Sequence, residues 1–320
     1  MATVLTVILN YRTAAMTVQA VQAALAAMAG IEGEVLVVDN DSQDGSFEAL
    51  TAQVPIGVRV IQSGHNGGFG AGNNVGIRAG LSDGACPDYI YVLNPDAFPD
   101  VHAIRHLLDT LEQNLNAGFA GSYIHGPDGT PHLTTFRFPS IASEFEGAVR
   151  FGPVSRLLAR FAVPVPIPAT TTLVDWLAGA SLLMRRSVLD QIGLFDETFF
   201  LYFEETDLCR RAQNAGHKVI FVRESDVTHI GSVSTGMKEW DRVPGYWFDS
   251  RWHYFVKNHG RVYAACATLA HLTGGLLHKL RCLLTGKTTA GAPHFLRSML
   301  WHDLGLGTPD RPAKLTRVSS

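Results

Sequence analysis

The sequence has no cysteine-pairing motif. Its four cysteines, at positions 86, 209, 266 and 282, form neither a C-x-x-C pair nor a zinc-finger spacing. Disulfide frameworks and structural zinc sites depend on such patterns. We therefore expect reduced thiols and a fold held by a buried apolar core. A chain of 320 residues is long enough to bury such a core, either as a single large domain or as a domain with an appendage.

The chain also has little net charge of either sign. Its formal net charge is -3, and its 17% charged and 46% hydrophobic residues are ordinary for a globular protein. Domains that bind duplex nucleic acid normally carry a clustered basic face, and none is evident here. The sequence predicts no nucleic-acid partner.

The first ten residues lack the basic region and the small-residue cleavage site of a signal peptide. Their Val, Leu and Ile residues instead predict a buried strand. We therefore expect a cytoplasmic protein.

One apolar segment, residues 261–285, raises the question of a membrane. It is interrupted by two histidines, Lys279 and Arg281, whereas a spanning helix needs about 20 predominantly apolar residues. Two interpretations stay open. The segment lies in the interface of the cytoplasmic membrane, with Arg261, Lys279 and Arg281 meeting lipid phosphates on the inner face. Alternatively, it is the core helix of a C-terminal helical cap.

The first half alternates β-branched runs with helical patterns, which is typical of a parallel α/β sheet. Expected strands cover residues 4–9, 34–38, 58–62 and 89–93. Thr13 can cap a helix whose Val18, Val21, Leu25 and Met28 share one face. Residues 125–172 are rich in proline and predict loops with one or two helices. A strand at 176–184, a helix at 204–213 and strands at 218–222 and 226–229 follow.

Three successive strands of this pattern end in polar or glycine-rich loops, at residues 39–46, 65–74 and 94–96. Open parallel sheets bind ligands at the carboxyl ends of their strands. The coincidence of three such loops predicts a binding site there.

Asp39 ends the second strand. A carboxylate at this point can accept the N3–H of uracil or thymine. The alternative is that Asp39, Asp41 and Asp44 only make turns in which their side chains bond the local backbone.

Asp96 follows the fourth strand in Asn94-Pro95-Asp96. One carboxylate bound to Mg²⁺ or Mn²⁺, with diphosphate oxygens and waters, is normal chemistry for a hard cation. The alternative is an ordinary turn at the end of a strand. His229, after a late strand, is a second candidate metal ligand.

Glu204 and Glu205 open the expected helix at 204–213 and follow five apolar or aromatic residues, 199–203. Two adjacent carboxylates can divide their roles, one held by donors and the other free as a general base. The alternative is acidic residues placed at a helix N-terminus by its macrodipole. That alternative does not account for the apolar surroundings, which favour a perturbed pKa.

Residues 67–74 are rich in glycine but do not form a dinucleotide-binding fingerprint. Asn73 stands where the third glycine belongs, and the loop follows the third strand instead of the first.

Taken together and in this order, these loops resemble the family 2 glycosyltransferases of the GT-A fold, and especially their bacterial rhamnosyltransferase-like branch. The matching segments cover about residues 3 to 230: 7–11, 37–46, 66–74, 93–96, 176–180 and 203–211. The resemblance implies an α/β fold with a mostly parallel central sheet flanked by helices. It also implies a transferase domain at 1–240, with a nucleotide-binding half at about 1–125 and an acceptor-side half at 126–240. A C-terminal helical extension at 241–320 follows.

The resemblance further implies an inverting single displacement. Asp39 binds the base, Asp96 holds the metal, and Glu205, or else Glu204, takes the acceptor proton, supported by Asp207 and Arg210. His229 stays the second candidate metal ligand from its place in the sequence. The residues expected around the nucleotide sugar are Asn10, Tyr11, Asp39, Asn66, Gly68, Phe69, Asn73, Asn94, Trp176, Gly179 and Ala180. Two departures stand out: Asn94 replaces the first acid of the usual D-x-D, and the usual Glu-Asp pair is Glu204-Glu205.

The branch suggests dTDP-L-rhamnose as donor, with a UDP-sugar as the alternative, and a saccharide or lipid-linked saccharide of the cell surface as acceptor. A sugar nucleotidyltransferase normally has its glycine-rich loop after the first strand, where this chain has Asn10-Tyr11-Arg12. A non-catalytic subunit that binds nucleotide or glycan is the alternative outside enzymes.

Overall fold

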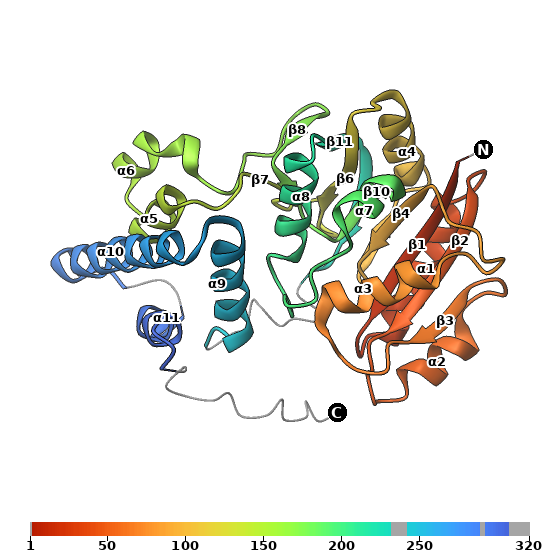
Figure 1. The fold of residues 1–320 in the computed structure, drawn as a ribbon, viewed down its shortest axis with the longest axis horizontal. Coiled ribbons are helices and arrows are strands. Elements are labelled where there is room, and N and C mark those ends of the chain that lie inside the picture. The colour runs from red at the N-terminus through yellow and green to blue at the C-terminus, as the bar shows by residue number, and fades with distance from the viewer. Residues whose placement is uncertain (1, 232–241, 289–291, 307–320) are drawn as a thin grey trace. The chain divides into compact units, whose positions relative to one another are not determined.

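The computed structural model describes residues 2–231, 242–288 and 292–306 (Figure 1). The chain forms two compact units. Unit 1 comprises Met1–Phe138, Pro164–Phe200 and Glu204–Gly236. Unit 2 comprises Pro139–Val163, Leu201–Phe203 and Met237–Ser320.

Unit 1 is built on a nine-stranded sheet. Its first half is parallel and has the strand order β3-β2-β1-β4 (Figure 1). These strands are β1 (Thr3–Asn10), β2 (Glu32–Asp39), β3 (Arg59–Gln62) and β4 (Tyr89–Leu93). All four lie where the sequence predicts them, with differences of a few residues at their ends.

The second half of the sheet is mixed. Strand β10 (Ser181–Arg185) runs antiparallel between β4 and β6 (Ala117–His125), and β6 pairs in parallel with β11 (Lys218–His229). The short strands β5 (Ala97–Pro99) and β8 (Thr172–Val174) pair antiparallel with β11. The two strands predicted at 218–222 and 226–229 are one strand, interrupted by a register shift between Val222 and Asp226. A separate two-stranded sheet joins β7 (Thr135–Phe136) to β9 (Trp176–Leu177).

Helices cover both faces of the sheet, which explains why its strands are apolar on both sides. Alternate side chains of β1 enter two apolar clusters: Ile8 lies with residues of the helices α1 and α4, and Leu5 with residues of α3, α7 and α8. The helices of unit 1 are α1 (Ala14–Ala27), α2 (Ser46–Gln53), α3 (Gly68–Ala79), α4 (Ala103–Gln113), α7 (Arg186–Ile192) and α8 (Glu204–Asn214). The predicted fold class is confirmed.

Helix α1 differs from its prediction in two details. Thr13 occupies the N-cap position, but its hydroxyl donates to Asn10 Oδ1 (3.2 Å) and makes no capping bond. Leu25, one of the apolar residues predicted to share a face, is 37% exposed, whereas Ala20 and Ala24 are buried. The helix therefore approaches the sheet through its alanines.

Unit 2 is helical. It contains α5 (Ile141–Val149), α6 (Gly152–Leu157), the 3₁₀ turn Ala159–Phe161, α9 (Gly245–His259), α10 (Arg261–Thr285) and α11 (Phe295–Asp303). Helix α10 packs closely on α5, since a Cβ added at Gly274 would lie 2.8 Å from the carbonyl oxygen of Phe145. Residues 139–163 thus pack with the C-terminal helices. The domain division near residue 240 stays a prediction. Among the described residues, no helix is both long enough and apolar enough to cross a membrane.

A buried ionic network holds unit 2 together around Arg251, which is fully buried. Its guanidinium donates to Glu144 Oε2 (2.9 Å) and to Thr268 Oγ1 (3.1 Å), and it pairs with Asp303 (3.4 Å). His271 also bonds Glu144 (2.8 Å). Burial alone would raise the pKa of Glu144, but the charges and hydrogen bonds of Arg251 and His271 outweigh it and lower that pKa to about 2.

We expect Arg251→Ala to lower the free energy of unfolding of unit 2 by about 3 kcal/mol or more, because it leaves Glu144 and Asp303 buried without their cation. Calorimetric unfolding of the full chain would measure the loss. Arg261→Ala is the matched control, since Arg261 is exposed and its loss should cost under about 0.5 kcal/mol. Equal stability of the two variants would contradict this role.

The same network predicts acid sensitivity. The pKa of Glu144 is lowered in the folded chain. The contribution of Glu144 to stability is therefore complete at pH values above 4.5, the ordinary pKa of a glutamate, and is lost as the pH falls toward about 2. Stability should therefore decrease across this window in the native chain, and less steeply in Arg251→Ala.

Candidate active site

The polar strand ends predicted to meet do lie at one edge of the sheet. Strands β1 and β2 end side by side at Asn10 and Asp39, which are register partners. Strand β10 is antiparallel to β4, so its first residue, Ser181, pairs with Leu93. This pairing brings residues 178–180 to the end of β4, where the Asn94 amide donates to the carbonyl of Ala180 (3.0 Å).

Asp39 is buried and held in one orientation. Its Oδ1 accepts from Asn10 Nδ2 (2.7 Å) and from the hydroxyl of Ser42, and its Oδ2 accepts from the Ser42 amide (3.2 Å). The carboxylate borders a cavity of about 440 Å³ that Phe47 and Gln62 also line. Asp44 makes the local turn proposed as the alternative, accepting from the Ser46 amide (3.0 Å). Asp39 also bonds its own loop, but unlike Asp44 it lines the cavity.

Asn10 and Tyr11 support this part of the site differently. Asn10 is fully buried, and its Oδ1 accepts from Thr17 (2.7 Å) while its amide group holds Asp39. It therefore acts through Asp39. The ring of Tyr11 is half-buried and lies 5.0 Å from the guanidinium of Arg12.

The glycine-rich loop begins α3 in a conformation that needs glycine. Gly68 has φ +89°, and a Cβ there would lie 1.8 Å from the carbonyl oxygen of Phe200. The Phe69 amide donates to that same oxygen (3.0 Å). Asn66 Oδ1 accepts from the Gly68 amide (3.0 Å) and from Asn40 (3.0 Å). These bonds fix the start of α3 at the edge of the sheet.

Asn73 lies one turn further along α3 and is fully buried. Its amide group donates to the carbonyl of Phe69 (2.9 Å), and its Oδ1 has no hydrogen-bond partner among the described residues.

Asp96 and His229 come together from β11 and the turn after β4. Asp96 Oδ1 lies 3.1 Å from His229 Nε2, and Asp96 Oδ2 accepts from the Gly231 amide (3.0 Å). Asn94 Nδ2 is 3.3 Å from the same imidazole nitrogen. Burial alone would raise the pKa of Asp96, but the hydrogen bond and charge of His229 lower it. The carboxylate is thus ionised at neutral pH.

These residues suit a divalent cation. Two ligands bound at about 2.1 Å on adjacent corners of an octahedron stand about 3 Å apart, which matches the Asp96–His229 spacing. Within the described ranges, no group of three or more His, Cys, Asp or Glu side chains is placed to hold a metal. A cation at this point would therefore have at most two ligands of these types, Asp96 and His229, from the described residues.

Glu204 and Glu205 begin α8. Burial, with the neighbouring charge of Glu205, raises the pKa of Glu204 well above 4.5, and burial also raises the pKa of Glu205. One carboxylate oxygen of each is buried without a hydrogen-bond partner among the described residues. The two preceding residues, Tyr202 and Phe203, have φ values of 71° and 70°. Non-glycine residues in this region store strain, which is common at functional sites.

The two glutamates adjoin the other parts of the site. The Gly179 amide bonds Glu205. A Cβ at Gly179 would lie 3.1 Å from the Phe69 ring and 3.9 Å from Glu205 Cβ, and one at Gly70 would lie 3.7 Å from Glu204 Cβ. The starts of α3 and α8 and the loop at 178–180 therefore meet.

The remaining predicted residues have structural contacts. Trp176 stacks on Phe136 with ring centroids 4.1 Å apart, and its Nε1 donates to the carbonyl of Arg137 (2.9 Å). Asp207 is fully buried and pairs with Arg211 (2.8 Å). Arg210 lies 5.1 Å from the ring of Phe138.

Sequence reasoning missed three residues: Asn40, Ser42 and Arg211. The i,i+4 spacing of Asp207 and Arg211 is a signal that could have identified that pair. Ser42 lies within the polar loop 39–46, but its bond to Asp39 depends on how that loop turns.

An α/β sheet with these groups at one edge is the architecture of the GT-A glycosyltransferases, and two solved structures share the fold. One is the mannosyltransferase PcManGT from Pyrobaculum calidifontis, in complex with GDP-Man and Mn²⁺. Its TM-score is 0.56 at 12% identity, covering 95% of this chain and 79% of that one. The other is GalNAc-T7 with UDP, GalNAc and Mn²⁺. Its TM-score is 0.54 at 15% identity, covering 97% of this chain and 58% of that one.

The model of glycosyl transferase family 2 matches residues 3–193, and the chain belongs to this family. It is therefore a glycosyltransferase, as the resemblance predicted. The N-acetylglucosaminyl-diphospho-decaprenol L-rhamnosyltransferase of Mycobacterium tuberculosis is 33% identical over 210 residues, which are 63% of this chain and 68% of the relative. Rhamnosyltransferase WbbL of Escherichia coli K12 is 26% identical over 196 residues, 60% of this chain and 72% of the relative.

Proposed function

We propose that this chain is an inverting, metal-dependent rhamnosyltransferase. It transfers L-rhamnose from dTDP-L-rhamnose to a hydroxyl of a lipid-linked saccharide that is built into a cell-surface polysaccharide. The observation that carries the proposal is the gathering of Asp39, the Asp96–His229 pair and the Glu204–Glu205 pair in one unit. The two rhamnosyltransferase relatives support the choice of sugar.

Asp39 accepts the N3–H of the pyrimidine, oriented for this by Asn10 and Ser42. Asp96 and His229 would hold Mg²⁺ or Mn²⁺, with Asn94 beside them. A cation there would supply positive charge for the leaving diphosphate. Because Asn94 replaces an acid, the site has one negative charge fewer than a D-x-D motif.

Glu205 is the general base. The acceptor oxygen attacks the anomeric carbon, the bond from that carbon to the phosphate oxygen breaks, and Glu205 takes the acceptor proton. Burial raises the pKa of both glutamates, but Glu204 is the more deeply buried, so the more accessible Glu205 is better placed to receive the acceptor proton. Attack opposite the leaving group inverts the configuration.

The side chains around the donor sugar are assigned by proximity to Glu205. Gly179 lies beside it and against the ring of Phe69. Ala180 follows Gly179 in the chain, and Trp176 lies in β9, just before this loop. Asn66, Gly68 and Asn73 set the position of Phe69. Asp207, with Arg211, fixes the helix that carries Glu205, and Arg210 lies on that helix.

A UDP-sugar is the alternative donor. Thymine and uracil present the same N3–H, and the 5-methyl group lies away from it, so Asp39 serves both. A lipid-linked acceptor places the enzyme at the inner face of the cytoplasmic membrane as a peripheral protein.

A thermal-shift titration with dTDP, UDP, GDP and ADP, with and without Mn²⁺, tests the site. Ligand at about 100 times its Kd should raise the midpoint by about 5 °C for dTDP or UDP, and only with metal. In Asp39→Ala no side-chain oxygen remains to accept the N3–H, so this shift should be lost. An equal shift with GDP or ADP, or none with any nucleotide, would refute the proposal and favour a non-catalytic subunit.

A further inference from the structure

Helix α10 turns its large apolar side chains to solvent. Val262 is 81% exposed, Leu269 64%, Leu276 61%, Leu280 53% and Leu283 79%. These positions recur three, four or seven residues apart, so they share one side of the helix. We call them the leucine stripe.

The opposite side of α10 consists of small residues and is buried. Ala264, Ala267, Gly274, Gly275 and Cys282 are on this side. Gly274 allows the approach to α5, and Gly275 contacts Leu296, whose Cδ2 lies 2.7 Å from an added Cβ. A core helix would bury its leucines. The reversed arrangement marks a surface for a partner of low polarity.

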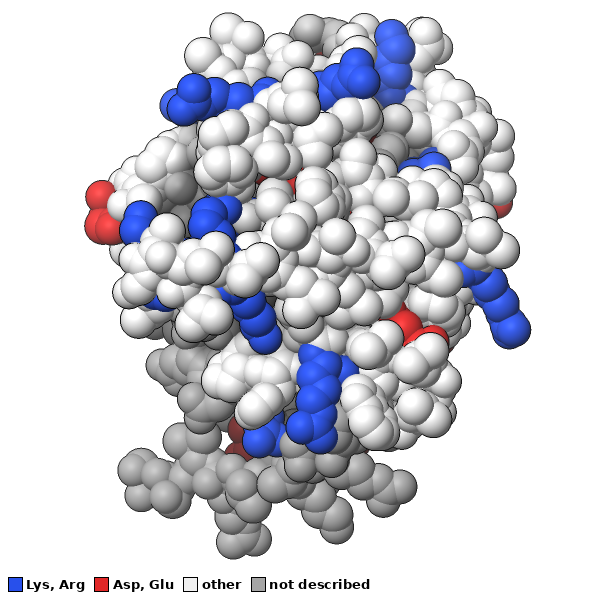
Figure 2. Space-filling view, turned by 90° about the vertical axis from the view of Figure 1, so that its left-hand side faces the viewer, with Lys and Arg blue, Asp and Glu red and all other residues white. Residues whose placement is uncertain are grey.

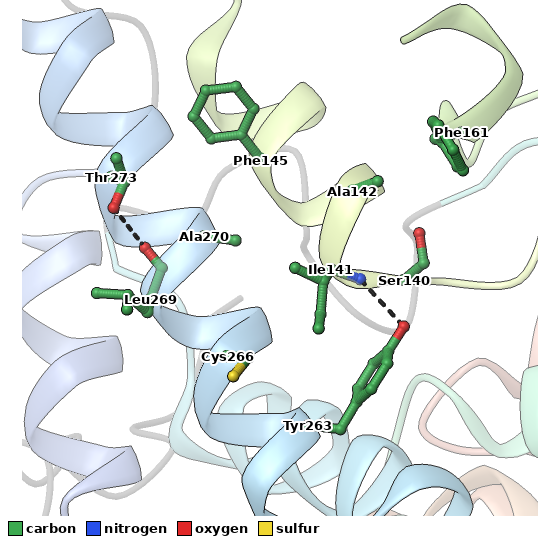
Figure 3. Close-up of a pocket in the computed structure, with 10 residues that line it drawn as sticks. All are labelled: Ser140, Ile141, Ala142, Phe145, Phe161, Tyr263, Cys266, Leu269, Ala270 and Thr273. Carbon is green, nitrogen blue, oxygen red and sulfur yellow. Dashed lines mark hydrogen bonds between the residues drawn. The ribbon is translucent and has the colours of Figure 1, made fainter.

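An apolar hollow of about 630 Å³ adjoins the stripe (Figure 3). Phe145, Phe161 and Ile141 line it from one side, and Leu269 and Cys266 of α10 from the other. Its polar groups bond one another: the Ile141 amide donates to the Tyr263 hydroxyl (3.3 Å), and Thr273 donates to the carbonyl of Leu269 (2.8 Å). The hollow therefore suits a hydrocarbon chain.

The charge around the stripe is positive. Between Asp249 and Asp303 the chain contains no Asp or Glu and seven Lys or Arg residues, although the whole chain has a net charge of -3. Figure 2 looks at the side of the molecule where α6 and α10 lie, and shows a largely uncharged surface with Lys and Arg spread over it and few acids. The exposed cations of unit 2 include Arg150, Arg156, Arg160, Lys279, Lys287 and Arg297.

We propose that unit 2 docks on an anionic lipid bilayer, with the leucine stripe in the acyl-chain boundary, a lipid chain in the hollow and the cations on lipid phosphates. Exposed leucines and exposed cations together match this partner. A second copy of the chain would instead bring equal positive charges together. The proposal concerns unit 2 alone and does not rest on the proposed donor or acceptor.

Flotation of the full chain with lipid vesicles tests the docking. The wild type should bind vesicles of phosphatidylcholine with phosphatidylglycerol, and bind pure phosphatidylcholine at least about tenfold less. The variant Leu276→Glu/Leu280→Glu/Leu283→Glu should lose at least about tenfold in binding. The matched control, Ile56→Glu/Leu115→Glu/Leu133→Glu, adds the same charge at exposed apolar positions of unit 1. Its vesicle binding should fall much less than that of the stripe variant.

Replacing Lys279 and Lys287 by Ala should weaken binding to the anionic vesicles by about fivefold per charge. Equal wild-type binding to both vesicle types, or full binding by the stripe variant, would overturn the proposal. The proposal would also be overturned if the wild type sedimented as a dimer and did not bind vesicles, while the stripe variant sedimented as a monomer. Because the stripe variant should keep the nucleotide-induced thermal shift, failure of docking is distinguishable from failure of the proposed function.

Discussion

Replacing Glu205 by Gln should lower kcat for glycosyl transfer by about 10²- to 10⁴-fold and leave donor binding nearly unchanged. Gln keeps the shape of the side chain but cannot accept the acceptor proton. Steady-state rates with dTDP-L-rhamnose and a saccharide acceptor, together with the thermal shift with dTDP, would separate the two effects.

Glu204→Gln is the matched control for this experiment. Because Glu204 is more deeply buried than Glu205 and is not the assigned base, a neutral amide there should cost far less activity than the same change at Glu205. The reverse order of effects would assign the base to Glu204.

The acid side of the pH–rate profile should report the same base. Burial raises the pKa of Glu205 above its ordinary value of 4.5, and a base must be ionised to act. Values of kcat/KM should therefore fall as the pH drops through this raised pKa, and the residual activity of Glu205→Gln should lack that dependence.

Asp96→Asn should lower kcat by about 10²- to 10³-fold, an effect like that of losing one electrostatic contact to a transition state. It should also raise the Mn²⁺ concentration needed for half-maximal activity, since a neutral amide is a poorer ligand than a carboxylate. Metal titrations of activity would measure both.

Asp226→Asn provides the control, because Asp226 also pairs with an imidazole, that of His125 (2.8 Å), in the same strand β11 as His229. It should leave the metal response unchanged. An unaltered response in Asp96→Asn would move the metal, or the need for one, away from this pair.

Local patterns were enough to predict the elements that set the site. Strand β4 lies at Tyr89–Leu93 as predicted. A run of five apolar residues bounded by turn residues is too short for a typical helix and favours a buried strand. The apolar runs of β2 and β4 also predicted where these two strands end. Parallel pairing then brought Asp39 and Asp96 to one edge, because the carboxyl ends of parallel strands share an edge.

Features that depend on tertiary contacts could not be read in the same way. The packing of residues 139–163 against α10 depends on Gly274, far along the chain. Leu25 is exposed because alanines allow α1 to lie closer to the sheet. The deeper burial of Glu204 relative to Glu205 depends on packing, which adjacent positions in a sequence do not distinguish.

The interleaving of the two units limits how such a chain can evolve. Unit 2 is assembled from three stretches, and its central one, Leu201–Phe203, immediately precedes the helix that carries Glu204 and Glu205. Loss of the C-terminal helices alone would leave α5 without the helix it packs on. A lineage that changes its lipid-facing helices must alter residues 139–163 together with them, within a region that the family pattern at 3–193 already spans.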